Sequence, residues 1–245
     1  MKYFLTIAAS DTSGGAGIQQ DLKVAQYYGF WGLSVITAIT VQDFEQVYCV
    51  QSVDLNMLEA QIAQLFKTFN PDCIKIGLIP NSQMLDLIAF YLKKTNAFVV
   101  LDPVLKSSSG FDFVDKDYIS ILKSILLKNI SILTPNSYEF GLLNDKVYEE
   151  YAMALQDAKL FVKRYKCAIY LKGGHFIDKQ IKEAYISHDN FQELSYERNK
   201  WVYSHGTGCA FSSALAINSI IHSDIKKVLH ESHRYVQDFY EALNI

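Results

Sequence analysis

The class of fold is indicated first by the glycine-rich segment Ser10-Asp11-Thr12-Ser13-Gly14-Gly15-Ala16-Gly17, because this segment joins two stretches of different hydrophobic period. Before it, Tyr3–Ala8 is a short, mostly apolar run with aromatic and β-branched side chains, which predicts a buried strand. After it, Gly17–Tyr28 has the spacing of a helix. A strand that enters a helix through a glycine-rich turn is typical of an α/β protein.

The same alternation continues along the chain. Further strands are expected at Leu33–Ile39, Cys73–Ile76, Phe98–Leu101, Ile130–Leu133 and Ala168–Leu171, and further helices at Asn56–Thr68, Gln83–Lys93, Asp115–Leu127, Ser137–Leu143, Tyr151–Lys166, Gly206–Ile221 and Ser223–Leu243. The segment Lys182–Tyr203 breaks this rhythm and predicts a hairpin with its turn at Asp189-Asn190. Continuously apolar strands alternating with helices indicate a mostly parallel sheet that is covered on both faces.

Length and composition favour one domain over residues 1–245 that acts on a small molecule. Half of the residues are hydrophobic, enough for a sizeable core, and the net charge of −3 provides no basic surface for nucleic acid or an anionic membrane. The four cysteines follow no metal or disulfide spacing, which indicates a reducing cytoplasm. No apolar stretch approaches the roughly 20 residues of a membrane span.

Polar segments follow several of the predicted strands, and ligands of such sheets bind outside the carboxyl ends of the strands. These segments are Thr40-Val41-Gln42-Asp43, Asp102-Pro103-Val104, Thr134–Glu139 and Lys172-Gly173-Gly174-His175, together with the two glycine-rich turns Ser10–Gly17 and Ser204–Cys209. A glycine-rich turn before a helix presents unpaired backbone N–H groups and the positive end of the helix dipole to an anion. Two such turns predict a phosphate-containing ligand.

Several phosphate-handling classes and one metal site are excluded by inspection. The chain has no G-x-x-x-x-G-K-[ST], neither glycine-rich turn completes G-x-G-x-x-G, and the protein-kinase catalytic set is missing. His230-Glu231-Ser232-His233 has the wrong spacing for the zinc motif H-E-x-x-H and predicts a solvated helix face.

Taken together, the motifs resemble the hydroxymethylpyrimidine/phosphomethylpyrimidine kinase family of thiamine biosynthesis, within the ribokinase-like superfamily. The resemblance runs from about Leu5 to about Ala216 and is carried by Ser10-Asp11-x-Ser13-Gly14-Gly15-Ala16-Gly17-Ile18-Gln19-x-Asp21-Leu22-Lys23, Val35-Ile36-Thr37-Ala38, Lys75-Ile76-Gly77, Leu133-Thr134-Pro135-Asn136 and His205-Gly206-Thr207-Gly208-Cys209. It implies a three-layer α/β/α sandwich without a lid domain, ATP as co-substrate, Mg²⁺, a homodimer, and two successive phosphorylations of an aminopyrimidine alcohol.

The resemblance also implies roles for individual residues. Gln42 resembles the residue that hydrogen-bonds the aminopyrimidine edge, and Asp21 and Gly17 resemble residues that line the same pocket. An amide suits this task, since it both donates and accepts. Cys209 matches the proposed catalytic base. A thiol at a helix N-terminus has a lowered pKa, so we expect Cys209 to be partly ionised near neutral pH.

For the phosphate side, the resemblance implies a triphosphate site made by Lys172 and the turn that contains Gly206, Thr207 and Gly208. Asn136 and Glu139 resemble the pair that helps to hold phosphate and magnesium, and Asp102 would assist Glu139 with the metal. Phosphoryl transfer depends mainly on positioning and charge neutralisation, which a lysine, a metal ion and backbone N–H groups supply.

Two alternatives stay open from the sequence. A pyridoxal kinase of the same superfamily also phosphorylates a hydroxymethyl group on a ring, although Gln42 and the Ser13–Gly17 loop favour the pyrimidine. A non-catalytic sensor of the pyrimidine is the alternative from another class. Retention of Lys172, Glu139 and Cys209 argues against it.

Overall fold

The computed structural model describes residues 1–105, 117–174, 176, 180–197, 201 and 204–243. Its strands are β1 (Tyr3–Asp11), β2 (Trp31–Gln42), β3 (Val47–Ser52), β4 (Cys73–Ile76), β5 (Phe98–Leu101), β6 (Ile132–Leu133), β7 (Ala168–Leu171), β8 (Gln180–Ile186) and β9 (Phe191–Glu197). Its α-helices are α1 (Gly17–Tyr27), α2 (Leu55–Thr68), α3 (Ser82–Leu92), α4 (Tyr118–Ile121), α5 (Ser137–Asn144), α6 (Tyr151–Tyr165), α7 (Thr207–Ile221) and α8 (Ile225–Leu243).

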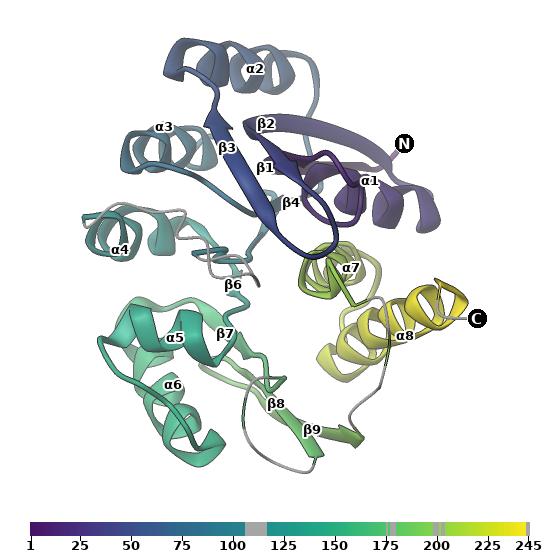
Figure 1. Cartoon of the computed structure of the whole chain (residues 1–245). Coiled ribbons are helices and arrows are strands. Elements are labelled where there is room, and N and C mark those ends of the chain that lie inside the picture. Colours follow the sequence, from purple (N-terminus) through teal and green to yellow (C-terminus); the bar gives the residue numbers. More distant parts are fainter. Residues whose placement is uncertain (106–116, 175, 177–179, 198–200, 202–203, 244–245) are drawn as a thin grey trace.

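Within the described part of the chain, nine strands form one sheet in the order β3-β2-β1-β4-β5-β6-β7-β8-β9 (Figure 1). The central strands β2, β1, β4, β5, β6 and β7 pair in parallel with one another, as the sequence predicted. Antiparallel strands extend both edges: β3 pairs with β2, and the expected hairpin of β8 and β9 pairs with β7. The mostly parallel sheet is therefore confirmed.

One strand was not predicted from the sequence, and one predicted helix is shorter than expected. β3 follows the carboxyl end of β2 through a tight turn and pairs antiparallel to it; its Val47-Tyr48-Cys49-Val50 segment has the β-branched and aromatic content of a strand. The helix expected at Asp115–Leu127 is α-helical only over α4 among the described residues, and wider turns at Leu122–Leu126 follow. Asp115 and Lys116 of that prediction, like His175, lie outside the described residues.

Helices cover both faces of the sheet. A core on one face includes Leu58 of α2, Ile88 of α3 and Phe161 of α6, while the core on the other face includes Val24 of α1 and Leu215 of α7. Figure 1 shows α1, α7 and α8 on one side of the sheet and α2 to α6 on the other. The three-layer α/β/α sandwich is thus confirmed, and nothing among the described residues forms a separate lid domain. None of the helices described has the length and apolar character needed to cross a membrane.

Candidate active site

A cavity of about 1330 Å³ opens at the carboxyl ends of the parallel strands, where α7 also begins. Typical pockets for one drug-sized ligand have volumes of about 300–1,000 Å³, so this cavity has room for two substrates. Every residue assigned to the site from the sequence lines it, with one exception: Gly17, Gln42, Asp102, Asn136, Glu139, Lys172, Gly206, Thr207, Gly208 and Cys209 line the cavity, whereas Asp21 does not.

The second glycine-rich turn forms the N-terminus of α7. Gly206 is the N-cap residue with φ of +82°, a left-handed conformation that favours glycine. A Cβ atom on Gly206 would lie 1.8 Å from the carbonyl oxygen of Gly15, so no other residue fits here without displacing the backbone. The amides of the first helical turn have no intrahelical acceptor, and Gly206 has no side chain to cap them. N–H groups at this end of α7 can therefore donate to an anion.

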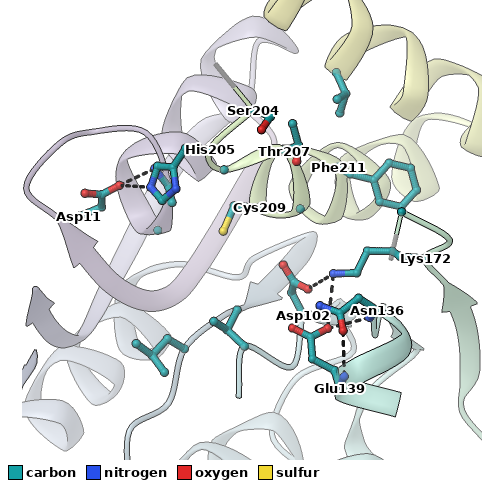
Figure 2. Close-up of a pocket in the computed structure, with 18 of the residues that line it drawn as sticks. Asp11, Asp102, Asn136, Glu139, Lys172, Ser204, His205, Thr207, Cys209 and Phe211 are labelled. Carbon is teal, nitrogen blue, oxygen red and sulfur yellow. Dashed lines mark hydrogen bonds and ion pairs between the residues drawn. The ribbon is translucent and has the colours of Figure 1, made fainter. Parts of the chain in front are cut away.

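A buried charge cluster lies beside this turn. The Lys172 ammonium lies 2.8 Å from Oδ1 of Asp102 and 3.7 Å from Oε2 of Glu139. A Cβ atom on Gly208 would be 3.6 Å from Lys172 Nζ, which shows how closely the cluster approaches the first turn of α7. Figure 2 shows Lys172, Asp102 and Glu139 on one side of Cys209 and Asp11 with His205 on the other.

The charges in this cluster control one another's ionisation. Burial alone would lower the pKa of Lys172, but Asp102 and Glu139 raise that pKa above its ordinary value, so the ammonium stays protonated. Burial opposes ionisation of Asp102 as well, yet Lys172 holds the pKa of Asp102 below its usual value. Burial raises the pKa of Glu139 to about 7, with Lys172 acting in the opposite direction. The cluster thus holds one permanent cation between two carboxyl groups of unequal acidity.

The oxygen atoms of Asp102 and Glu139 suit a nucleotide-bound magnesium ion. The described residues contain no group of three or more His, Cys, Asp or Glu side chains arranged to hold a metal. Magnesium bound to substrate phosphates, however, needs only one or two protein carboxylates. The donor set therefore fits a metal that arrives with the nucleotide and does not fit a permanent all-protein metal site.

Asn136 and Glu139 also start helix α5. The Asn136 side chain accepts from the backbone N–H of Glu139 at 2.8 Å, and the Glu139 carboxylate accepts from the backbone N–H of Asn136 at 2.7 Å. This reciprocal pair is a capping box, which the N-x-x-E spacing could have revealed in the sequence. Both side chains are consequently fixed in place at the edge of the cavity.

In the first glycine-rich turn a side chain accepts from the local backbone amides, whereas no side chain caps the second. The Asp11 carboxylate accepts from the backbone N–H groups of Ser13, at 2.8 Å, and Ala16, at 2.7 Å. Burial alone would raise the pKa of Asp11, but hydrogen bonds from His205, Gln42 and Ser13 hold that pKa well below its usual value. A side-chain carboxylate thus already accepts from backbone amides of this turn.

The prediction that Asp21 lines the pyrimidine pocket is wrong. Asp21 lies on the inner face of α1, is completely buried, and accepts from Lys75 at 2.9 Å, Thr6 at 2.6 Å and Ser213 at 2.8 Å. Burial would lower the pKa of Lys75, but Asp21 raises it, so Lys75 remains a cation at the floor of the cavity. A helix whose inner face packs on β1 and α7 cannot direct residue 21 into the pocket.

Cys209 lies in the cavity, but the expectation of a lowered pKa is wrong. Burial raises the pKa of Cys209 to about 11, and the nearby ammonium of Lys75 opposes this increase only in part. The Asp21 and Asp102 carboxylates add to the increase. The sequence indicated the helix N-terminus but could not indicate these two acidic neighbours.

Lys75 lines the cavity but was not assigned to it from the sequence. It sits inside the otherwise apolar strand β4, and a lysine in such a strand indicates a buried ion pair, since buried lysines are almost always paired.

Two more cavity residues were not assigned from the sequence. They are His233, whose Nε2 lies 2.5 Å from the Tyr170 hydroxyl, and Glu183, which accepts from the Gly173 N–H at 3.0 Å. The solvated face predicted for His230–His233 is therefore correct for the exposed His230 and wrong for His233.

Solved structures with this architecture identify the class of protein. The phosphomethylpyrimidine kinase of Clostridium difficile 630 is 28% identical, with a TM-score of 0.84 over 98% of this chain and 99% of that one. The pyridoxal kinase of Bacillus subtilis, solved with ADP, is 25% identical, with a TM-score of 0.85 over 96% and 90% of the two chains. Together with Lys172 and the glycine-rich turn at the start of α7, these similarities define a kinase with the ribokinase-like fold.

Sequence comparison narrows the class to one family. The model of the family described as phosphomethylpyrimidine kinase matches residues 11–244. The hydroxymethylpyrimidine/phosphomethylpyrimidine kinase of Aquifex aeolicus (strain VF5) is 30% identical over 96% of this chain and 92% of its own length. That of Escherichia coli (strain K12) is 33% identical over 86% and 80%. The chain belongs to the phosphomethylpyrimidine kinase family.

Proposed function

We propose that the protein transfers the γ-phosphoryl group of ATP to the hydroxymethyl group of 4-amino-5-hydroxymethyl-2-methylpyrimidine, and then phosphorylates the resulting monophosphate to the diphosphate. One observation carries the proposal: the uncapped amides of α7 and the Lys172 ammonium face the same cavity as Gln42 and Cys209. One cavity therefore contains groups suited to the phosphate donor and groups suited to the small polar ring that accepts the phosphoryl group.

The pyrimidine would bind at the end of β2. Gln42 terminates that strand and contacts the Asp11 carboxylate, which leaves amide hydrogen-bonding capacity for an aminopyrimidine edge. Gly17 has φ of +55°, and a Cβ atom there would lie 2.3 Å from the carbonyl oxygen of Ala9. Glycine at this position keeps the loop close to β1 and the pocket open to a flat ring.

The ATP phosphates would lie between α7 and the charge cluster. The backbone around Thr207 and Gly208 would donate to phosphate oxygens, Lys172 would neutralise developing charge, and Asn136 and Glu139 would border the triphosphate. Asp102 and Glu139 are the residues that would hold magnesium, which supplies charge neutralisation on the phosphates when bound. Phe211 and Val236 provide an apolar wall for the nucleobase.

Cys209 is the proposed base for the first phosphorylation only. The alcohol must lose a proton, whereas the monophosphate attacks through an oxygen that is already anionic. Because the pKa of Cys209 is about 11, its thiolate fraction rises about tenfold per pH unit through the neutral range. We expect the rate of the first step to rise with pH between 7 and 9 and this slope to vanish in Cys209→Ala, with a weaker pH slope in the second step. Equal slopes in both steps would remove Cys209 from the proton transfer.

Competing turnover assays test the proposed function. Purified protein should release ADP with the aminopyrimidine alcohol and with its monophosphate, at a higher kcat/KM than with pyridoxal. A preference for pyridoxal would reassign the substrate, since pyridoxal kinases share this fold. Binding of the pyrimidine without ADP release would instead identify a sensor.

The family membership also supports a cytoplasmic homodimer. Sedimentation velocity at micromolar protein concentration should give a species of about twice the 27.9 kDa chain mass. A monomer under turnover conditions would contradict the dimer without affecting the assigned chemistry.

A further inference from the structure

The C-terminal helix contacts the anion-binding turn through one side chain. Tyr240, near the end of α8, is 2% exposed, and its hydroxyl donates to the backbone carbonyl oxygen of His205 at 2.8 Å. Trp201 stacks on the Tyr240 ring with centroids 5.5 Å apart. Figure 1 shows α8 lying beside α7, and this contact places the tyrosine at the start of α7. A buried hydroxyl therefore contacts the peptide group that opens the turn.

This hydrogen bond fixes the orientation of the peptide group between His205 and Gly206. In a trans peptide, the C=O and N–H groups point in opposite directions from the same plane. A carbonyl that points towards Tyr240 consequently turns the Gly206 N–H away from α8. Gly206 has no Cβ atom that would favour one backbone conformation, and it adopts a φ of +82°. The direction of its amide must therefore be set by neighbouring groups.

Two other contacts are made by the same two residues. The His205 ring lies 3.2 Å from Asp11 through Nε2, and Gly206 packs so tightly on Gly15 that a Cβ atom would overlap the Gly15 carbonyl oxygen. A Cβ atom on Gly206 would also lie 3.2 Å from the Tyr240 hydroxyl. The turn thus contacts both α8 and the first glycine-rich loop.

We infer that Tyr240 is a positioning residue for phosphoryl transfer: its hydroxyl sets the direction of the amides that open α7. This inference rests on the proposed function. Donors that stabilise a transition state must be held close to their productive geometry, so a small rotation of this peptide reduces the rate without removing any group that touches substrate.

The test compares Tyr240→Phe with Tyr28→Phe. Tyr28 is a matched control, because its hydroxyl also joins α8 to α7, donating to the Glu231 carbonyl at 3.2 Å and accepting from Asn218 at 3.0 Å. Neither tyrosine lines the cavity, but only the Tyr240 hydroxyl bonds to the turn that opens α7. Tyr240→Phe should lower kcat about tenfold for both phosphorylations and change the KM for the pyrimidine less than about twofold. Tyr28→Phe should lower Tm by a similar amount and leave kcat within about twofold.

Hydrogen exchange provides a readout that does not depend on activity. The amides of Thr207 and Ala210, which donate to the carbonyl oxygens of Ser204 at 3.4 Å and Gly206 at 2.9 Å, should exchange faster in Tyr240→Phe than in the parent protein, with no change in Tyr28→Phe. Equal kcat in the two variants, or unchanged exchange at these amides, would overturn the inference. If the parent protein phosphorylates neither pyrimidine, the proposed function fails, and the exchange comparison still decides whether Tyr240 fixes the turn.

Discussion

The two glycine-rich turns look alike in the sequence and differ in what their amides do. The first turn joins β1 to α1, and the second lies between the β8–β9 hairpin and α7. Glycine with positive φ occurs in both: Gly14 and Gly17 in the first turn, and Gly206 in the second. In the first turn, the Asp11 carboxylate accepts the local N–H groups. In the second, no side chain caps the helix, and Lys172 lies beside it. The presence of an internal carboxylate, and not the glycine content, distinguishes a structural turn from an anion site.

The largest contrast between the turns is expected for alanine at their glycines. Gly206→Ala places a Cβ atom against the Gly15 carbonyl and forces an unfavourable φ, so the free energy of unfolding should fall by about 3 kcal/mol and kcat/KM by at least about 100-fold. Gly14→Ala has the same sign of φ but open space around it, so we expect a loss of only about 1 kcal/mol. Urea unfolding and turnover assays measure both values, and similar losses would contradict the contrast.

Asp21 connects the helices that follow the two turns. It lies on α1, after the first turn, and bonds to α7, after the second turn. Its substitution therefore tests whether both turns depend on this buried contact. Asp21→Asn leaves the Lys75 ammonium buried without its counter-charge, which should reduce the free energy of unfolding by about 3–5 kcal/mol. Asp157→Asn removes the charge from an ion pair whose lysine, Lys146, is exposed, and should cost about 1 kcal/mol or less. Equal losses in denaturant titrations would mean that the buried pair contributes no more than a surface pair.

Each turn has a lysine close to it, and we expect the two lysines to differ in their effect on kcat. Lys172→Gln should reduce kcat by about 100–1,000-fold, because the cation beside the uncapped amides is lost. Lys23→Gln removes an exposed ammonium that donates to the Gly14 carbonyl at 2.7 Å and should leave kcat within about threefold. Steady-state kinetics with saturating ATP gives both values. A large effect at Lys23 would assign phosphate chemistry to the first turn.

The smallest effect is expected on the pyrimidine side. Gln42→Leu should weaken binding of the aminopyrimidine alcohol by about 1–3 kcal/mol, since polar groups of the buried ring lose their partners. Affinity for ATP should stay the same, because Gln42 and Lys172 extend from opposite parts of the sheet. Calorimetry with each ligand separately checks the result. A comparable loss of ATP affinity would reject the assignment of Gln42 to the pyrimidine.

Local patterns were sufficient for most of the architecture. The short, largely apolar runs, such as Cys73–Ile76, favour strands over helices through their length and β-branched content, and the observed bounds of this strand agree residue for residue. β3 was missed because it is an edge strand with exposed side chains, so its hydrophobic pattern is weak. Wider turns replaced the predicted helix after Ile121, where packing rather than propensity sets the backbone.

The alternation of strands and helices, the polar residues at the strand ends and the glycines of the turns could be predicted from the sequence, because they depend on neighbours close in the chain. Three features required the folded structure: Asp21 points inward to Lys75, burial and distant carboxylates raise the pKa of Cys209, and Tyr240 contacts His205. Each of those outcomes depends on groups brought together from remote positions, and electrostatic and hydrogen-bonding energies depend on such distances rather than on residue order.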